Sequence, residues 1–160
     1  MSAEEYPITT GVRFLRDNKI EFAPLLYIYE PKGGTAVSAR ELGVEEHRII
    51  KTLVMETDPR NQFLILMHGD KEVSTKQLAR AMGVKSVNPA TEQTAQRVTG
   101  YQVGGISPFG TRQKIPIYIE ASILALPKII INGGKRGFLV EIEPQQIKRV
   151  FAVTEVNAAI

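Results

Sequence analysis

The segment IIKTLVMETDPRNQFLILMH, residues 49–68, decides the fold. It contains two runs rich in aliphatic and β-branched residues, 49–57 and 62–68, which are separated by the turn-forming stretch DPRN at 58–61. Both faces of the first run are nearly apolar, which is typical of a strand in the middle of a sheet. The sequence therefore predicts a β-hairpin at the centre of a β-sheet.

Helices and strands interleave on both sides of this hairpin, and the interval 99–111 is too rich in Gly and Pro for regular structure. Helices are expected over 9–18, 38–42, 74–82 and 91–98 and from Pro144 onward, and further strands over 22–30, 116–120, 128–132 and 137–143. A tight hairpin among interleaved helices argues against a purely parallel sheet. The sequence predicts the α+β class: a single domain over residues 1–160, with a mixed and partly barrel-like curled β-sheet and helices packed outside.

The composition excludes several kinds of chemistry. The 160 residues include no cysteine and no tryptophan, so disulfides, thiolate metal sites and a cysteine nucleophile are absent. The two histidines are 21 positions apart, with His47 expected to face solvent and His68 expected to be a structural residue, so we predict no metal and no cofactor. The segment MSAEEYPITT has no basic and apolar signal pattern, and no apolar run could span a membrane, which predicts a cytoplasmic protein.

The positive charge is unevenly distributed along the chain. The formal net charge is +3, but residues 71–160 carry +6 and the first seventy residues carry −3. Such an asymmetry favours a surface that faces an anionic partner in the second half. Solvated lysines without a partner would give the same pattern.

Lys51 is the most informative charged residue. Because side chains alternate along a strand, Lys51 shares a face with Ile49, Leu53 and Met55. An ammonium group on an apolar face is costly to desolvate unless it meets an anion or several acceptors. We interpret Lys51 as directed into a pocket, where it would hold a carbonyl, carboxylate or phosphate oxygen. The alternative is a lysine near a strand end whose ammonium reaches water.

Two glycine-rich segments are candidates for binding. The loop GYQVGGISPFG, residues 100–110, has four glycines, which let backbone N–H groups approach an oxygen and stabilise a developing oxyanion. It is not a nucleophile elbow, because no glycine follows Ser107 by two positions. The alternative is a structural Ω-type loop. The turn NGGKRG, residues 132–137, fits neither a P-loop nor a dinucleotide fingerprint, which leaves a solvated hairpin turn or a phosphate contact.

Three motifs occur in an order and spacing that resemble the YbaK-type aminoacyl-tRNA deacylases, relatives of the editing domain inserted in bacterial prolyl-tRNA synthetases. They are Ile50-Lys51-Thr52-Leu53, the loop 100–110 and the Gly133–Gly137 turn. The resemblance extends from the helix at 9–18 to the helix opened by Pro144. It implies hydrolysis of the ester between a wrong amino acid and the terminal adenosine of tRNA, with Cys-tRNA(Pro) or Cys-tRNA(Cys) as the substrates of the members closest in motif.

The resemblance also implies a site without a side-chain nucleophile. A water, or the thiol of a cysteine substrate, would attack the ester while glycine-loop amides stabilise the oxyanion and Lys51 orients substrate oxygens. The residues implied as catalytic are Lys51, Gly104, Gly105 and Ser107, and those implied as substrate-binding are Tyr29, Thr52, Gly110, Asn132, Gly133 and Gly134. The implied partners are mischarged tRNA, through its 3′-terminal aminoacyl-adenosine, and prolyl-tRNA synthetase.

Two positions depart from the cysteine-selective members. Asn132 stands where they usually have serine, and Leu139 stands where they tend to have aspartate. Hydrolysis is therefore better supported than selectivity for cysteine, and alanine or another small amino acid stays open. One alternative is a non-catalytic module of the same fold that binds a tRNA 3′ end or a nucleotide. Another is a hydrolase of a different small ester or a free nucleotide.

Overall fold

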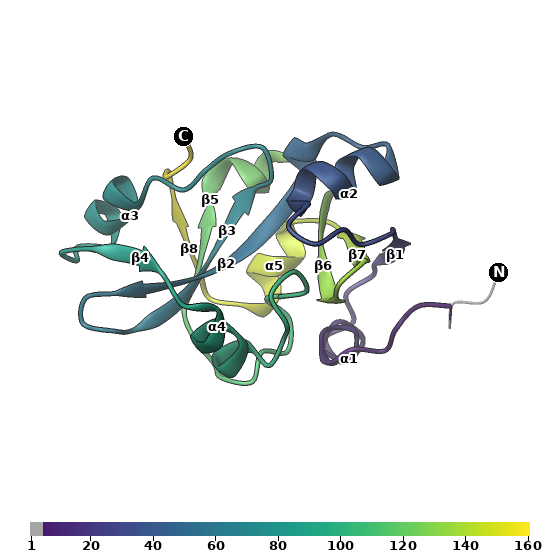
Figure 1. The fold of residues 1–160 in the computed structure, drawn as a ribbon, viewed down its shortest axis with the longest axis horizontal. Helices are drawn as coiled ribbons and strands as arrows, with labels where there is room; N and C mark the ends of the chain where they lie inside the picture. The colour runs from purple at the N-terminus through teal and green to yellow at the C-terminus, as the bar shows by residue number, and fades with distance from the viewer. Residues whose placement is uncertain (1–4) are drawn as a thin grey trace.

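The hairpin predicted over residues 49–68 forms the centre of one mixed β-sheet (Figure 1). The structure is a computed structural model that describes residues 5–160. Residues 1–4 lie outside the described residues. They belong to the expected 1–160 domain and to the segment in which no secretory signal is expected. The sheet has eight strands in the order β1-β7-β6-β2-β3-β5-β8, with β4 also paired to β2. The α+β class and the mixed sheet are confirmed, and the sheet is open because β1 and β8 end this order.

The strands and helices of the described chain agree closely with the predicted elements. The strands are β1 (Ala23–Leu26), β2 (Ile49–Thr57), β3 (Gln62–His68), β4 (Val87–Pro89), β5 (Ile117–Glu120), β6 (Ile129–Lys135), β7 (Phe138–Ile142) and β8 (Val153–Val156). The α-helices are α1 (Thr10–Asp17), α2 (Gly34–Leu42), α3 (Thr75–Met82), α4 (Glu92–Thr99) and α5 (Gln145–Val150). Two 3₁₀ helices are η1 (Glu46–Arg48) and η2 (Ala121–Ala125).

Local side chains explain where the helices begin and end. Ser74 caps α3 by accepting a hydrogen bond from the backbone N–H of Gln77, and α3 ends at Gly83 in the left-handed region at φ 70°. Threonines cap α1 and α4 in the same way. None of the described helices is long and apolar enough to cross a bilayer.

Three predicted boundaries were wrong, and two strands were not predicted. β6 extends to Lys135, three residues past its predicted end and into the segment predicted as a turn. β1 ends at Leu26 instead of continuing to residue 30, because its partner β7 extends only to Phe138, opposite Leu26. α2 begins at Gly34 and not at the predicted residue 38, so the helix is about one turn longer than expected. Neither β4 nor β8 was expected, since each has four residues or fewer and is held by pairing to β2 or β5.

The two faces of β2 pack against different helices. On one face Ile50 and Val54 join the main core, together with residues from α1, α4 and α5 such as Leu15, Val98 and Ile147. On the other face Ile49 packs in a cluster beside α2, and Met55 packs in a cluster under α3. Lys51 lies on this second face, between the two clusters.

Candidate functional site

Lys51 is largely enclosed but keeps access to solvent. Its side chain is 20% exposed, and its Nζ lies 3.6 Å from Oε1 of Glu72, whose side chain is 83% exposed. An ion pair with such an exposed partner stabilises by at most about 1 kcal/mol. Glu72 is therefore a weak counter-ion that an anionic or carbonyl ligand could replace.

The sheet places Lys51 next to Asn132. β2 and β6 pair in parallel only through Ile49 with Ile130 and Ile50 with Ile131. Asn132 follows Ile130 by two positions, as Lys51 follows Ile49, so both side chains leave the same face of the sheet at the point where the two strands separate. The motif Ile50-Lys51-Thr52-Leu53 and the glycine turn 132–137 are therefore adjacent in the sheet.

Asn132 joins the two glycine segments. Its Oδ1 accepts hydrogen bonds from the N–H groups of Gly134 (2.6 Å) and Lys135 (3.2 Å), and its Nδ2 donates to the Gly104 carbonyl (3.2 Å). All three contacts are made to backbone. Asn132 therefore positions both predicted loops, and these contacts explain why an amide side chain fits here.

Tyr29 and Arg136 complete the junction. The Arg136 guanidinium lies 5.2 Å from the centre of the Tyr29 ring, and its Nε donates to the Val103 carbonyl at 2.9 Å. A Cβ at Gly104, which has φ +93°, would lie 2.5 Å from the Tyr29 hydroxyl oxygen. Only glycine allows the loop to pass this close to the tyrosine.

The backbone donors of the loop are not equivalent. The Gly105 N–H already donates to the Gln102 carbonyl at 2.8 Å. Among the described residues, the Gly104 N–H has no hydrogen-bond partner. Of the two predicted oxyanion donors, the Gly104 amide is the one available to a ligand.

Other predicted site residues pack inside the two glycine segments and support their conformation. Ser107 is completely buried, and its Oγ accepts a hydrogen bond from the Phe109 N–H at 3.1 Å. A Cβ at Gly110 would meet the Thr10 carbonyl of α1, and one at Gly133 would meet the Phe138 ring. These contacts fit positioning residues, and a direct role of Ser107, Gly110 or Gly133 toward a substrate stays a prediction.

Residues at the start of α1 form hydrogen bonds to both glycine segments. The Thr9 hydroxyl donates to the Gly133 carbonyl at 2.5 Å, and the Thr10 hydroxyl donates to the Tyr101 hydroxyl at 2.9 Å. The Tyr101 hydroxyl in turn donates to the Phe109 carbonyl. Burial raises the pKa of Tyr101, which keeps this donor protonated.

Thr52 does not meet the other predicted residues. It pairs with Leu66 and points to the face opposite Lys51, where its Oγ1 is buried without a partner among the described residues. Sequence reasoning missed Thr9, Tyr101 and Arg136 as supports of the site. Thr9 and Arg136 bind the carbonyls of Gly133 and Val103, far away in the sequence, and Tyr101 binds Thr10 of α1 as well as Phe109 of its own loop. A single sequence carries no signal for the distant contacts.

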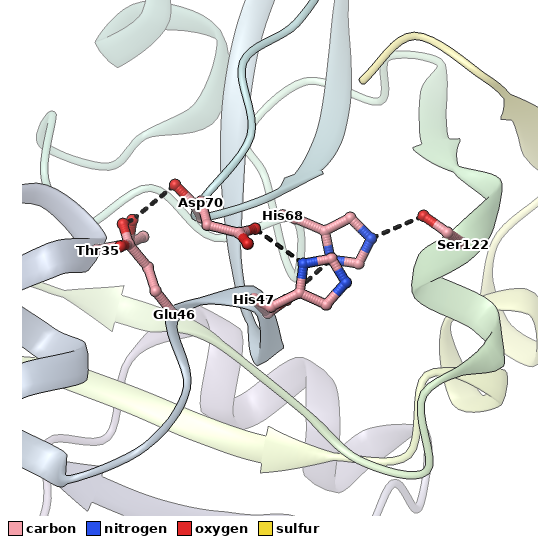
Figure 2. A network of polar contacts seen from close by, with 7 residues as sticks. Thr35, Glu46, His47, His68, Asp70 and Ser122 are labelled. Atoms are coloured by element: carbon pink, nitrogen blue, oxygen red, sulfur yellow. Dashed lines mark hydrogen bonds and ion pairs between the residues drawn. The ribbon is translucent and has the colours of Figure 1, made fainter. Parts of the chain in front are cut away.

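A second polar cluster lies at the open end of the hairpin (Figure 2). The His47 and His68 rings stack with centroids 3.7 Å apart and an interplanar angle of 8°. His68 Nδ1 donates to the His47 carbonyl and its Nε2 accepts from the Ser122 hydroxyl, both at 2.8 Å. The structural role predicted for His68 is confirmed. His47 has access to solvent, as predicted, since its side chain is 38% exposed, and its Nδ1 also binds Asp70 at 2.9 Å.

The cluster resembles a metal-ligand set only in its residue types. Ligand atoms of His47, His68 and Asp70 lie within 4.8 Å of one another. A metal binds in the plane of each imidazole ring, and two parallel stacked rings share no such position. Both His68 nitrogens are also engaged in hydrogen bonds. The geometry favours a hydrogen-bonded structural cluster.

The cluster makes the stability of the protein sensitive to acid. Burial lowers the pKa of His68, against the opposing effects of the His47 carbonyl, Asp70 and Glu120. The unfolded chain therefore takes up a proton that the folded protein resists. The stability from neutral His68 is full above about pH 7 and is lost as the pH falls below the unfolded value of about 6.5, at about 1.4 kcal/mol per unit of pKa difference. We expect His68→Gln to be less stable at pH 7.5 but to show a smaller loss between pH 7.5 and 5.5 in urea unfolding.

An Asp70→Asn variant is the control for the His68→Gln prediction. Asp70, whose pKa is lowered by His47 although burial opposes this, loses its contribution only at lower pH, below about 4. An Asp70→Asn variant should keep at least the wild-type slope between pH 7.5 and 5.5, because the Asp70 carboxylate opposes the lowering of the His68 pKa. Equal slopes for the wild type and His68→Gln would contradict the prediction.

Comparisons with known proteins agree with the geometry. A model of the family described as "Aminoacyl-tRNA editing domain" matches residues 30–150. The Enterococcus faecalis protein named "Putative Cys-tRNA(Pro)/Cys-tRNA(Cys) deacylase EbsC" is 31% identical over 140 residues, which cover 87% of this chain and 85% of that protein. A proline–tRNA ligase of Brachyspira hyodysenteriae is 34% identical over 86 residues, which cover 54% of this chain and 15% of the ligase.

A solved structure shows the same fold. It is described as "Crystal structure of a putative trans-editing enzyme for prolyl tRNA synthetase" and matches with a TM-score of 0.81 at 19% identity, covering 97% of this chain and 99% of that one. The family model covers most of the chain, and EbsC is similar over most of its own length. This chain therefore belongs to the aminoacyl-tRNA editing domain family.

Proposed function

We propose that this protein is a trans-editing hydrolase that cleaves the ester of mischarged aminoacyl-tRNA, with Cys-tRNA(Pro) or Cys-tRNA(Cys) as the first candidate substrates. The observation that carries the proposal is the junction built by Asn132. It binds both glycine segments, holds Gly104 against Tyr29 and leaves the sheet on the same face as Lys51. Family membership and the printed name of the EbsC relative support the same activity.

The proposed reaction needs no side-chain nucleophile. Water, or the substrate's own thiol when the amino acid is cysteine, adds to the ester carbonyl carbon. The Gly104 N–H donates to the oxyanion that forms, and the Lys51 ammonium holds the terminal adenosine or a substrate oxygen. The bond between the carbonyl carbon and the ribose oxygen then breaks, and the ribose oxygen leaves with a proton as the tRNA 3′-terminal hydroxyl. An oriented donor of this kind contributes about 3–4 kcal/mol of transition-state stabilisation.

The surroundings of Asn132 favour a small, uncharged amino acid. Leu139 lies opposite Asn132 in the β6–β7 ladder and is only 4% exposed, packed beside α2. A leucine at this position places a hydrocarbon side chain, in place of a carboxylate, beside the strand that carries Asn132. Apolar surroundings favour cysteine or alanine, and an apolar site separates these two by only about 1–3 kcal/mol. We propose mischarged tRNA(Pro) as the partner, with prolyl-tRNA synthetase supplying it in the cytoplasm.

A panel of aminoacyl-tRNAs tests the proposal. Purified protein is incubated with Cys-, Ala-, Ser- and Pro-tRNA(Pro) and with Cys-tRNA(Cys), and loss of the ester is followed over time. We expect hydrolysis of the cysteinyl or alanyl esters and protection of correctly charged Pro-tRNA(Pro). If no ester is hydrolysed while tRNA binding is intact, the hydrolase proposal is wrong and the chain is a binding module.

A further inference from the structure

A basic groove is lined by residues of α3, β4 and the segment between them. In Figure 1 α3 and β4 lie on the left of the molecule, and β1 lies on the right. Its volume is about 450 Å³. The lining includes three cationic side chains, from Lys76, Arg80 and Lys85, and three neutral polar side chains, from Thr75, Ser86 and Asn88. No acidic and no aromatic residue lines it.

The three cations have no structural partner that explains them. Within residues 5–160 none of them forms an ion pair, and all three are exposed. Lys76 and Arg80 are four positions apart on α3, an arrangement in which like charges repel and destabilise the helix. The helix is held to the sheet by its other face, through Leu78 and Ala79. Three unpaired positive charges at one groove produce a positive potential that favours binding of an anionic ligand.

The groove and Lys51 lie on the same side of the sheet. α3 packs on the face of β2 that carries Met55, which is also the face of Lys51. Asn88 of the groove pairs with Glu56, five residues after Lys51 along β2. That separation corresponds to about 17 Å of strand, which is the length of a few nucleotides.

We propose that this groove binds backbone phosphates of the tRNA acceptor strand, on the nucleotides that precede the terminal adenosine. Lysine and arginine provide the charge, and the hydroxyl and amide side chains provide hydrogen-bond donors, as in most contacts to nucleic-acid phosphates. The groove has no aromatic side chain on which a base could stack, so we expect it to bind phosphates without preference for a base sequence. The choice of ligand rests on the proposed function.

Salt-dependent binding of uncharged tRNA(Pro) tests the groove. The test variant is Lys76→Gln/Lys85→Gln. The control is Lys128→Gln/Lys148→Gln, which removes the same charge, partly from α5 on the opposite face of the sheet. Loss of two phosphate contacts to a single strand should reduce the slope of log Kd against log salt by about 1.4. The control should keep the wild-type slope, and thermal unfolding should confirm that both variants are folded.

A second measurement separates this proposal from the proposed function. Aminoacyl-adenosine has no acceptor strand, so the test variant should hydrolyse it at the wild-type rate while kcat/KM for aminoacyl-tRNA falls. Binding of uncharged tRNA requires no chemistry, so a reduced slope supports the groove even if no ester is cleaved. A wild-type slope in the test variant would overturn the proposal, as would a loss of binding only to prolyl-tRNA synthetase.

Discussion

Replacing Lys51 by alanine is expected to lower kcat/KM for deacylation by about 100- to 1,000-fold, which is the usual effect of removing one charge-stabilising donor from a preorganised site. Lys51 is largely enclosed, and its one ion-pair partner within residues 5–160 is an exposed carboxylate. The ammonium is therefore free to bind a substrate oxygen. The measurement is single-turnover deacylation of the preferred ester from the aminoacyl-tRNA panel.

Three variants distinguish this role from a structural one. Lys51→Met keeps an unbranched side chain without the charge and should lose as much activity as Lys51→Ala while retaining its packing. Glu72→Gln removes the counter-ion and should deacylate at least as fast as the wild type. Lys51→Arg retains the charge and should recover part of the activity. Equal rates for the wild type and Lys51→Ala would refute the role of the lysine.

Gly104→Ala is expected to reduce deacylation by about 100-fold or more, because it displaces the loop amide that we propose as the oxyanion donor. The new Cβ would lie 2.5 Å from the Tyr29 hydroxyl oxygen, and the backbone has φ +93°. Either the tyrosine or the loop has to move. Rates with the preferred substrate, compared with the melting temperature, measure the effect.

Gly100→Ala is the matched control for this substitution. Gly100 has a similar positive φ of +80°, but its closest neighbour would be the Arg112 Cβ at 3.5 Å. Both alanine variants carry the same kind of backbone strain, and only Gly104→Ala adds the collision. Tyr29→Phe should partly rescue Gly104→Ala by removing the hydroxyl oxygen. Similar losses for Gly100→Ala and Gly104→Ala would show that backbone strain alone is responsible.

The hairpin, the caps and the glycine-rich loop were predictable because their signals are local. Two apolar runs around a turn predict β2 and β3, and Ser74 with Gly83 predicts both ends of α3. The pairing of β8 with β5 was not predictable, because a four-residue strand owes its existence to a partner more than thirty residues away. The same holds for the start of α2, which no capping side chain marks.

The sequence singled out candidate site residues, but it could not show how their contacts differ. Lys51 stood out because a cation on an apolar strand face is costly, and the glycine loop stood out by composition. The sequence could not show that the Gly105 amide is already used within the loop, or that Ser107 is buried beneath it. It also could not show that His47 and His68 stack, since the hairpin and η1 bring them together only in the folded protein.

The attachment of the glycine turns to α1 has a consequence for the origin of the proposed rate. A main-chain dipole lowers a barrier only if it is oriented before the reaction, because reorientation at that moment would consume the gain. Thr9, Thr10 and Tyr101 restrict both turns when the chain folds. The conformational entropy of these two turns is thus lost when the protein folds. It does not have to be lost again in each turnover.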